Sequence, residues 1–209
     1  MTLDRREFLR LLSTGPLWLC LQQAMAATGP TGEEALPIAY RAIGQLHGVP
    51  PGLLYAIACN ESSAWLTSRR VRPWPWTLNV EGRGERYASR EDAHAAILRH
   101  LAAGRVSTDI GLLQVNWKYH HARLGDDPWT ALEPLHNMAT GAQILRDQYE
   151  ASGEWWLAVG RYHSPGNPER AERYRAAIRR QFERLQQALA AERPNDPGLV
   201  WYADTGGHR

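Results

Sequence analysis

The chain has 209 residues, which is enough for one domain with a substantial hydrophobic core. Apolar residues make up 44% and charged residues 22%, as in ordinary globular proteins. The formal net charge of +2 argues against a strongly basic nucleic-acid-binding protein, so we expect no nucleic-acid partner. Nine Trp stand against two Phe, and Trp suits both half-buried core positions and sites that bind sugars.

Residues 1–26 have the features of an export signal peptide. Arg5 and Arg6 precede an apolar run over 11–21, and Ala-Met-Ala at 24–26 fits a small-x-small cleavage site. The segment around the paired arginines resembles the twin-arginine signal, which exports folded proteins, and a general secretory signal is the alternative. The apolar run is too short to span a membrane. We therefore expect a mature chain that is free in the periplasm, without stable membrane insertion.

The two cysteines fall on either side of the expected cleavage site. Leu19 before Cys20 is too large for a typical lipid-anchoring motif, so we expect Cys20 to be removed with the signal. Cys59 is then the one cysteine of the mature chain and cannot form an internal disulfide. Because it lies in the apolar run 53–59, we expect a buried, inert thiol.

The first half of the mature chain is predicted to form helices followed by a short β-hairpin. A first helix is expected over 32–47, ended by Gly48 and two prolines, and a second helix begins near Pro51 and runs through Glu61. Apolar residues at helical spacing place Glu61 on the same face as the core positions of this helix. Alternating residues within 73–88, with a Gly-Arg-Gly turn, predict the hairpin.

The second half is predicted to be helical. Ser89 and Asp92 resemble a capping box that opens a helix to about Ala103. A short helix is expected over 111–122, and the apolar spacing within 135–149, 155–162 and 174–189 predicts three amphipathic helices, the first of which ends before Gly153. We therefore expect a single domain over 32–192, followed by a polar, flexible tail over 193–209.

Glu61 is a candidate catalytic acid. Cutting a glycosidic bond requires an acid that is still protonated near neutral pH, and a carboxyl group meets this condition only when its pKa is raised, usually by loss of hydration. Glu61 follows an apolar helical face and precedes Ser62 and Ser63, where the helix is expected to stop. Judged by position alone, a solvent-exposed glutamate at a helix end is the commoner case. Motifs elsewhere in the chain favour the catalytic interpretation.

These motifs follow Asn60-Glu61-Ser62 in a definite order. They are Gly-Leu-Leu-Gln-Val-Asn at 111–116, Asn137 followed by Gly141-Ala142, Val-Gly-Arg-Tyr-His-Ser-Pro-Gly at 159–166, and Arg173-Tyr174. Their order resembles the soluble lytic transglycosylase family, over roughly residues 36–180. The resemblance implies a mainly α, single-domain, lysozyme-like fold of the goose-type lysozyme or SLT kind, with a short β-hairpin. The lead Ser-Thr-Asp-Ile-Gly at 107–111 is similar to the subgroup associated with type III and type IV secretion and with conjugation.

The resemblance also implies a role for each matching residue. Glu61 matches the family's catalytic glutamate, which first donates a proton and then accepts one. Gln114 matches the motif glutamine that lines the sugar groove, and Asn116, two residues on, caps a helix or braces the motif. Tyr162 matches a tyrosine near the reacting sugar, with core packing as the alternative, and Tyr174 matches a second, C-terminal tyrosine.

The chain departs from the family's pattern at three positions. Leu113 replaces the methionine that usually precedes the motif glutamine, which is a mild apolar exchange. His163 and Ser164 replace the asparagine and the alanine that usually follow the tyrosine at 162. Since a histidine can titrate near neutral pH, the pH profile implied by the resemblance need not hold here.

A lysozyme-type hydrolase normally uses two carboxyl groups. Asp109 is the best candidate for a second one because it lies close to Gln114 in the sequence. An aspartate before the start of a helix is more simply an N-cap, and we expect capping to be its main role.

The resemblance implies a reaction that needs no cofactor and no metal. In the family one glutamate suffices, because the C6 hydroxyl of the substrate attacks the anomeric carbon and leaves a 1,6-anhydro-muramic sugar without consuming water. His120 and His121 would diverge on a helix, and the chain has no His-Glu-x-x-His or paired-cysteine motif.

Three functions stay open at this point. They are a lytic transglycosylase of peptidoglycan, a true hydrolase of the same fold, and a non-catalytic wall-binding module. The expected partner is the peptidoglycan glycan strand, and the subgroup resemblance adds a secretion or conjugation apparatus.

Overall fold

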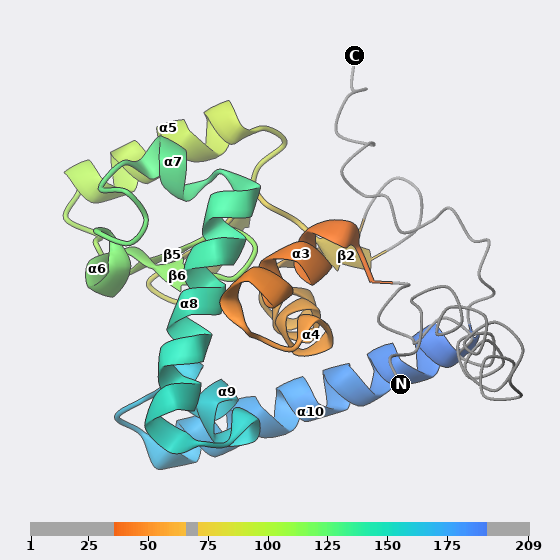
Figure 1. Ribbon diagram of the computed structural model, residues 1–209. Coiled ribbons are helices and arrows are strands. Elements are labelled where there is room, and N and C mark those ends of the chain that lie inside the picture. Colours follow the sequence, from red (N-terminus) through yellow and green to blue (C-terminus); the bar gives the residue numbers. More distant parts are fainter. Residues whose placement is uncertain (1–35, 66–70, 192–209) are drawn as a thin grey trace, which may run out of the picture.

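The computed structural model describes residues 36–65 and 71–191 (Figure 1). The expected export signal, the beginning of the expected first helix at 32–35 and the C-terminal tail all lie outside the described residues. Within them, no helix is both long enough and apolar enough to span a membrane.

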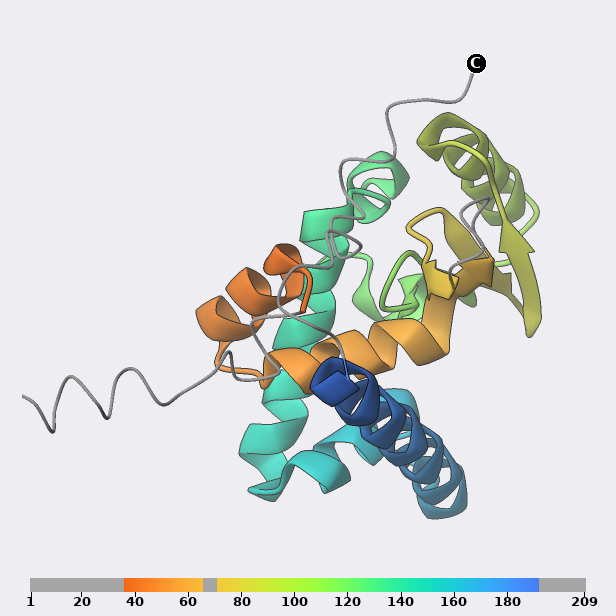
Figure 2. The ribbon, with the colours of Figure 1, turned by 90° about the vertical axis from the view of Figure 1, so that its right-hand side faces the viewer.

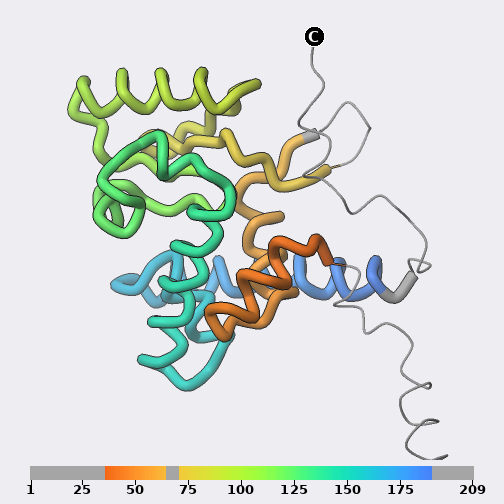
Figure 3. Tube along the Cα trace, turned by 45° about the horizontal axis from the view of Figure 1, so that its top comes forward, coloured from red at the N-terminus to blue at the C-terminus, as the bar shows by residue number. Residues whose placement is uncertain are grey.

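One part of the molecule consists of helices from both ends of the chain. They are α3 (Ile38–His47), α4 (Pro51–Ser62), α8 (Pro134–Ser152), α9 (Trp155–His163) and α10 (Pro168–Ala191). Helix α4 contacts α3 and α10, while α8 contacts α3 and α9, so segments far apart in the sequence enclose α4 (Figures 1 and 3). Gly48 and Gly153 end α3 and α8 in the left-handed conformation, as the sequence predicts.

Helix α4 is the centre of the hydrophobic core. The side chains from Gly52 to Ala58 are all buried, and Leu54, Ile57 and Ala58 are completely inaccessible to solvent. The predicted apolar face exists, but the helix is buried on its other sides as well, as expected for a helix surrounded by protein. Its C-terminal end leaves the core at Glu61, which keeps partial exposure.

The other part is a small antiparallel sheet with three further helices (Figure 2). Strands β3 (Thr77–Val80), β4 (Arg83–Arg86), β5 (Thr108–Ile110) and β6 (Val115–Asn116) pair in the order β4-β3-β5-β6. Separately, β1 (Ser63–Trp65) pairs with β2 (Val71–Pro73) at the end of α4. The predicted hairpin is β3 and β4, and the sheet is larger than predicted. The three helices are α5 (Arg90–Ala102), α6 (Trp117–His120) and α7 (Pro128–Ala131).

The helix predicted over 111–122 is wrong. Residues 111–114 form a turn, with Gly111 at a φ of 80° and Gln114 at a φ of 45°, and only the four residues of α6 are helical. Two left-handed residues so close together cannot continue a right-handed helix. By contrast, the predicted cap of α5 is confirmed, because Ser89 Oγ accepts a hydrogen bond from the N–H of Asp92 at 3.1 Å.

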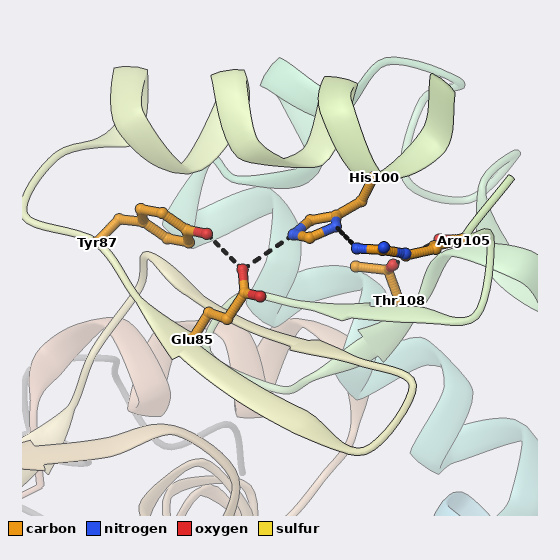
Figure 4. Close-up of polar contacts among 5 residues, drawn as sticks. All are labelled: Glu85, Tyr87, His100, Arg105 and Thr108. Atoms are coloured by element: carbon orange, nitrogen blue, oxygen red, sulfur yellow. Dashed lines mark hydrogen bonds and ion pairs between the residues drawn. The ribbon is translucent and has the colours of Figure 1, made fainter. Parts of the chain in front are cut away.

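A polar cluster ties α5 to the hairpin (Figure 4). Glu85 on β4 accepts hydrogen bonds from the hydroxyl of Tyr87 and from Nε2 of His100 on α5, the latter at 3.0 Å. Arg105 Nη1 donates to Nδ1 of the same imidazole at 3.3 Å, and Thr108 Oγ1 donates to the Arg105 carbonyl at 2.8 Å. The cluster therefore fixes the start of β5, the strand that carries Asp109.

Candidate active site

The turn over 110–114 is anchored to α8 by Asn137. Its Oδ1 accepts from the N–H of Leu113 at 3.0 Å, and its Nδ2 donates to the carbonyl of Ile110 at 2.9 Å. Asn137 is fully buried, so these bonds replace the water that its amide would otherwise bind. A Cβ on Gly111 would lie 2.6 Å from this amide, and a Cβ on Gly141 would lie 2.7 Å from the Leu113 side chain. Glycine is therefore required at both positions.

The same turn is bound by α4 and α9. Ser62 Oγ donates to the Leu112 carbonyl at 2.9 Å, and Tyr162 Oη donates to the Leu113 carbonyl at 2.7 Å. The motifs that are separate in the sequence thus meet at one place. Because Ser62 directly follows Glu61, its bond holds the end of α4 against the turn.

Glu61 has the electrostatic environment of a proton donor. Tyr174 Oη donates a hydrogen bond to Glu61 Oε1. Burial raises the pKa of Glu61 from 4.5 to about 7; the hydrogen bond from Tyr174 lowers it, the Asp109 charge raises it, and a hydrogen bond from Asn60 lowers it. Near neutral pH both protonation states of the carboxyl group are therefore populated, while part of the residue is open to solvent. Such a group can both give and take a proton.

The two predicted tyrosines have different partners. Tyr174 on α10 is only 7% exposed and contacts Glu61, whereas the Tyr162 hydroxyl is bound to the backbone of Leu113. Burial raises the pKa of each phenol well above 10, and the Glu61 charge adds to the effect. Both phenols therefore stay protonated near neutral pH and act as hydrogen-bond donors.

Asp109 does not cap a helix, contrary to our expectation. It lies in β5, paired with Asn79 of β3 and Asn116 of β6, and Asn116 Nδ2 donates to its Oδ1 at 2.6 Å. Asn116 braces Asp109, and its side chain does not cap the N-terminus of α6. Among the described residues, the buried Oδ1 atoms of Asn79 and Asn116 have no hydrogen-bond partner. Burial raises the pKa of Asp109, and the hydrogen bond from Asn116 opposes this shift. Since the charge of Asp109 raises the pKa of Glu61, a second carboxyl group lies near the candidate acid.

Gln114 uses its amide N–H groups inside the protein. Its Nε2 donates to the carbonyl of Thr77 at 3.0 Å and to the carbonyl of Gly111 at 2.8 Å. With these donors engaged, the side chain offers Oε1 as an acceptor for a ligand. Gln114 therefore also links the turn to β3.

Comparison with known proteins finds one family to which this part of the chain is similar. The family model described as "Transglycosylase SLT domain" matches residues 79–182. This part of the chain is similar to the transglycosylase SLT domain. The described part of the chain is mainly helical with a small antiparallel sheet, so the predicted lysozyme-like SLT fold is confirmed. Comparison with curated proteins and with solved structures gives no match.

The SLT match begins after Glu61. It contains Gln114, Asn116, Tyr162 and Tyr174, while the position of Glu61 beside them comes from the contacts of α4 and α10. Members of the family are lytic transglycosylases that act on peptidoglycan, so the match supports this class of substrate for the domain.

Sequence reasoning missed three residues of the candidate site. It gave Ser62 and Asn137 no role, although both fix the turn, and it did not consider Asn79. A polar residue directly after the candidate acid and an asparagine at the start of an apolar helix were available as signals for the first two. The position of Asn79 depends on strand register, which no local pattern indicates.

Cys59 is partly rather than fully buried, and burial raises the pKa of its thiol to about 11, which makes it unreactive as a nucleophile near neutral pH. Over residues 36–65 and 71–191, no group of three or more His, Cys, Asp or Glu side chains is arranged to hold a metal ion.

Proposed function

We propose that this chain is a peptidoglycan lytic transglycosylase that cleaves the β-1,4 bond between MurNAc and GlcNAc and leaves a 1,6-anhydro-MurNAc end. The observation that supports it most directly is Glu61, a partly exposed carboxyl group whose pKa is about 7 and whose Oε1 is held by Tyr174. The SLT match of residues 79–182 supports the class of reaction and substrate.

In the proposed reaction Glu61 acts twice. The protonated carboxyl group donates its proton to the glycosidic oxygen as the bond from that oxygen to the anomeric carbon breaks. The resulting carboxylate then takes the proton of the C6 hydroxyl while that oxygen bonds to the anomeric carbon. Glu61 ends protonated again and no water is consumed. A pKa near 7 suits both steps, because neither protonation state is strongly disfavoured.

The decisive experiment is product analysis. Purified peptidoglycan is incubated with the mature wild-type protein and with Glu61→Gln, and the released muropeptides are identified by mass spectrometry. We expect anhydro ends from the wild type and turnover at least ~100-fold slower from Glu61→Gln. Glu91→Gln, at an exposed position on α5, is the matched control and should behave as the wild type. A wild type that binds peptidoglycan but releases no product would instead indicate a wall-binding module.

A hydrolase of the same fold is the second candidate, and Asp109 favours it. A hydrolase must hold a water molecule near the acid, and the buried oxygens of Asn79 and Asn116 flank the Asp109 carboxyl group with unused acceptor capacity. Hydrolysis gives reducing ends one water molecule heavier than anhydro ends, and they carry the heavy isotope when the reaction is run in ¹⁸O-labelled water. Loss of such a product in Asp109→Asn, with anhydro product retained, would support a minor hydrolytic activity.

We also propose that the protein is exported and acts in the periplasm, where it opens the wall locally for a secretion or conjugation apparatus. The proposal rests on the paired Arg5 and Arg6 and on the subgroup motif at 107–111. Replacing both arginines by lysine should block export if the twin-arginine route is used and change little otherwise. Gene deletion should reduce transfer or secretion, with rescue by the wild type but not by Glu61→Gln.

A further inference from the structure

His163 stacks on the tyrosine that contacts Glu61. The imidazole and the Tyr174 ring have centroids 4.5 Å apart and planes inclined by only 13°. Tyr174 is buried and His163 is exposed, so the imidazole covers one face of the phenol ring. The hydroxyl of the same phenol donates to Glu61 Oε1. The three side chains therefore form a series that runs from the surface to the candidate acid.

The backbone around this stack is closely packed. A Cβ on Gly160 of α9 would lie 3.0 Å from the Ala171 carbonyl of α10, so the two helices are in near-contact there. His163 follows Gly160, and Tyr174 follows Ala171, by about one helical turn each. The close approach of α9 and α10 thus brings the two rings together.

We propose that His163 is a positioning residue that acts through Tyr174 to hold the phenol hydroxyl on Glu61. The inference rests on the proposed function, in which Glu61 exchanges a proton with the sugar. The phenol oxygen lies at the far end of a rigid ring, so a small rotation of that ring would move the hydroxyl away from Oε1. The parallel imidazole blocks rotation toward its side.

His163 does this as a neutral ring. Partial loss of hydration lowers its pKa, and the Arg170 charge on α10 lowers it further. The other groups that face it are Ser164, whose Oγ lies 3.0 Å from Nδ1, and the Tyr174 ring, with Glu61 beyond that ring. A neutral imidazole supplies a flat surface without adding a positive charge beside the acid. The asparagine usual at this position in the family has no ring to stack.

The experiment compares His163→Ala, which removes the ring, with His163→Phe, which keeps a flat ring but cannot titrate. Arg161→Ala, an exposed change on the same helix, is the matched control for Glu61 titration. Each variant is made in the wild-type and Tyr174→Phe backgrounds. Two experiments are made on each variant. One gives kcat and KM on soluble glycan strands across pH, and the other gives the titration midpoint of the Glu61 carboxyl group by infrared difference spectroscopy against Glu61→Gln.

We expect His163→Ala to lower kcat several-fold with little change in KM, and to move the Glu61 midpoint upward, because a less ordered Tyr174 donates a weaker hydrogen bond to the carboxylate. His163→Phe should retain most of kcat and the wild-type midpoint. In the Tyr174→Phe background, His163→Ala should cause no further change in kcat or in the Glu61 midpoint. An effect that persists in that background, or an unchanged midpoint in His163→Ala, would overturn the inference.

The infrared titration separates this inference from the proposed function. If the wild type releases no product but the Glu61 midpoint responds to His163→Ala and not to His163→Phe, the proposed function fails and the positioning role stands. If product forms and the Glu61 midpoint is unchanged in both variants, the positioning role fails and the proposed function stands.

Discussion

Replacing Glu61 by glutamine should stabilise the protein at alkaline pH and leave its stability unchanged in acid. The pKa of Glu61 is about 7 in the folded protein, against 4.5 for an ordinary glutamate. Between these values the folded state binds more protons than the unfolded state, so the free energy of unfolding of the wild type falls as pH rises from about 4.5 to about 7. This sign is opposite to that of a carboxylate in a salt bridge.

The magnitude follows from the two pKa values. Each pKa unit corresponds to about 1.4 kcal/mol, so the wild type loses at most ~3.5 kcal/mol between acid and alkaline pH. Partial exposure of Glu61 lets solvent reduce this, and we expect roughly 1–3 kcal/mol. A glutamine does not titrate, and its Oε1 can still accept the hydrogen bond from Tyr174. The stability difference between Glu61→Gln and the wild type should therefore be near zero at pH ~4 and largest above pH ~8.

Urea unfolding at a series of pH values, followed by circular dichroism, measures this difference, and the exposed Glu91→Gln serves as the control. The measurement needs no substrate and so does not depend on the proposed activity. A Glu61→Gln variant whose advantage does not grow with pH, or that is less stable than the wild type above pH ~8, would refute the argument that burial holds the proton on Glu61.

Three further changes probe the neighbours of Glu61. Tyr174→Phe removes a donor to the carboxylate, so the pKa of Glu61 should rise and the alkaline limb of the pH–rate profile should move up by about one pH unit. Tyr162→Phe should lower the free energy of unfolding by ~1 kcal/mol in urea titrations, through loss of its bond to the turn at 110–114, and should reduce turnover as that turn loosens. Gln114→Ala should lower the melting temperature by several degrees as well as weaken glycan binding in pull-down assays, because it loses the two internal bonds that link the turn to β3.

Elements that depend on local interactions could be predicted from the sequence. The cap of α5 at Ser89 and the ends of α3 and α8 at Gly48 and Gly153 follow from residues within one turn of each position. The helical position of Glu61 could be predicted for the same reason, because the apolar run before it determines where the helix lies.

Elements that depend on distant partners could not be predicted. Residues 111–114 have a helix-like apolar pattern, but the N–H of Leu113 bonds to Asn137 on α8 and not to a carbonyl within a helix. Asp109 was expected to cap a helix, yet it pairs with Asn79, which is thirty positions earlier in the chain. Nothing in the sequence near Asp109 specifies that register. Tyr174 on α10 and Asp109 on β5, which shift the pKa of Glu61, are also distant in the sequence, so no local pattern indicates them.

Asp109 and Tyr174 should move the pKa of Glu61 in opposite directions, and this gives a last test of the site. Between the two carboxyl groups, Asp109 has the lower ordinary pKa and a stabilising bond from Asn116, so Asp109 ionises first and its charge then favours protonated Glu61. Asp109→Asn removes that charge, so the pKa of Glu61 should fall and the alkaline limb of the pH–rate profile should move to lower pH. Tyr174→Phe should move the same limb to higher pH. Shifts of the same sign in both variants would mean that the limb reports some group other than Glu61.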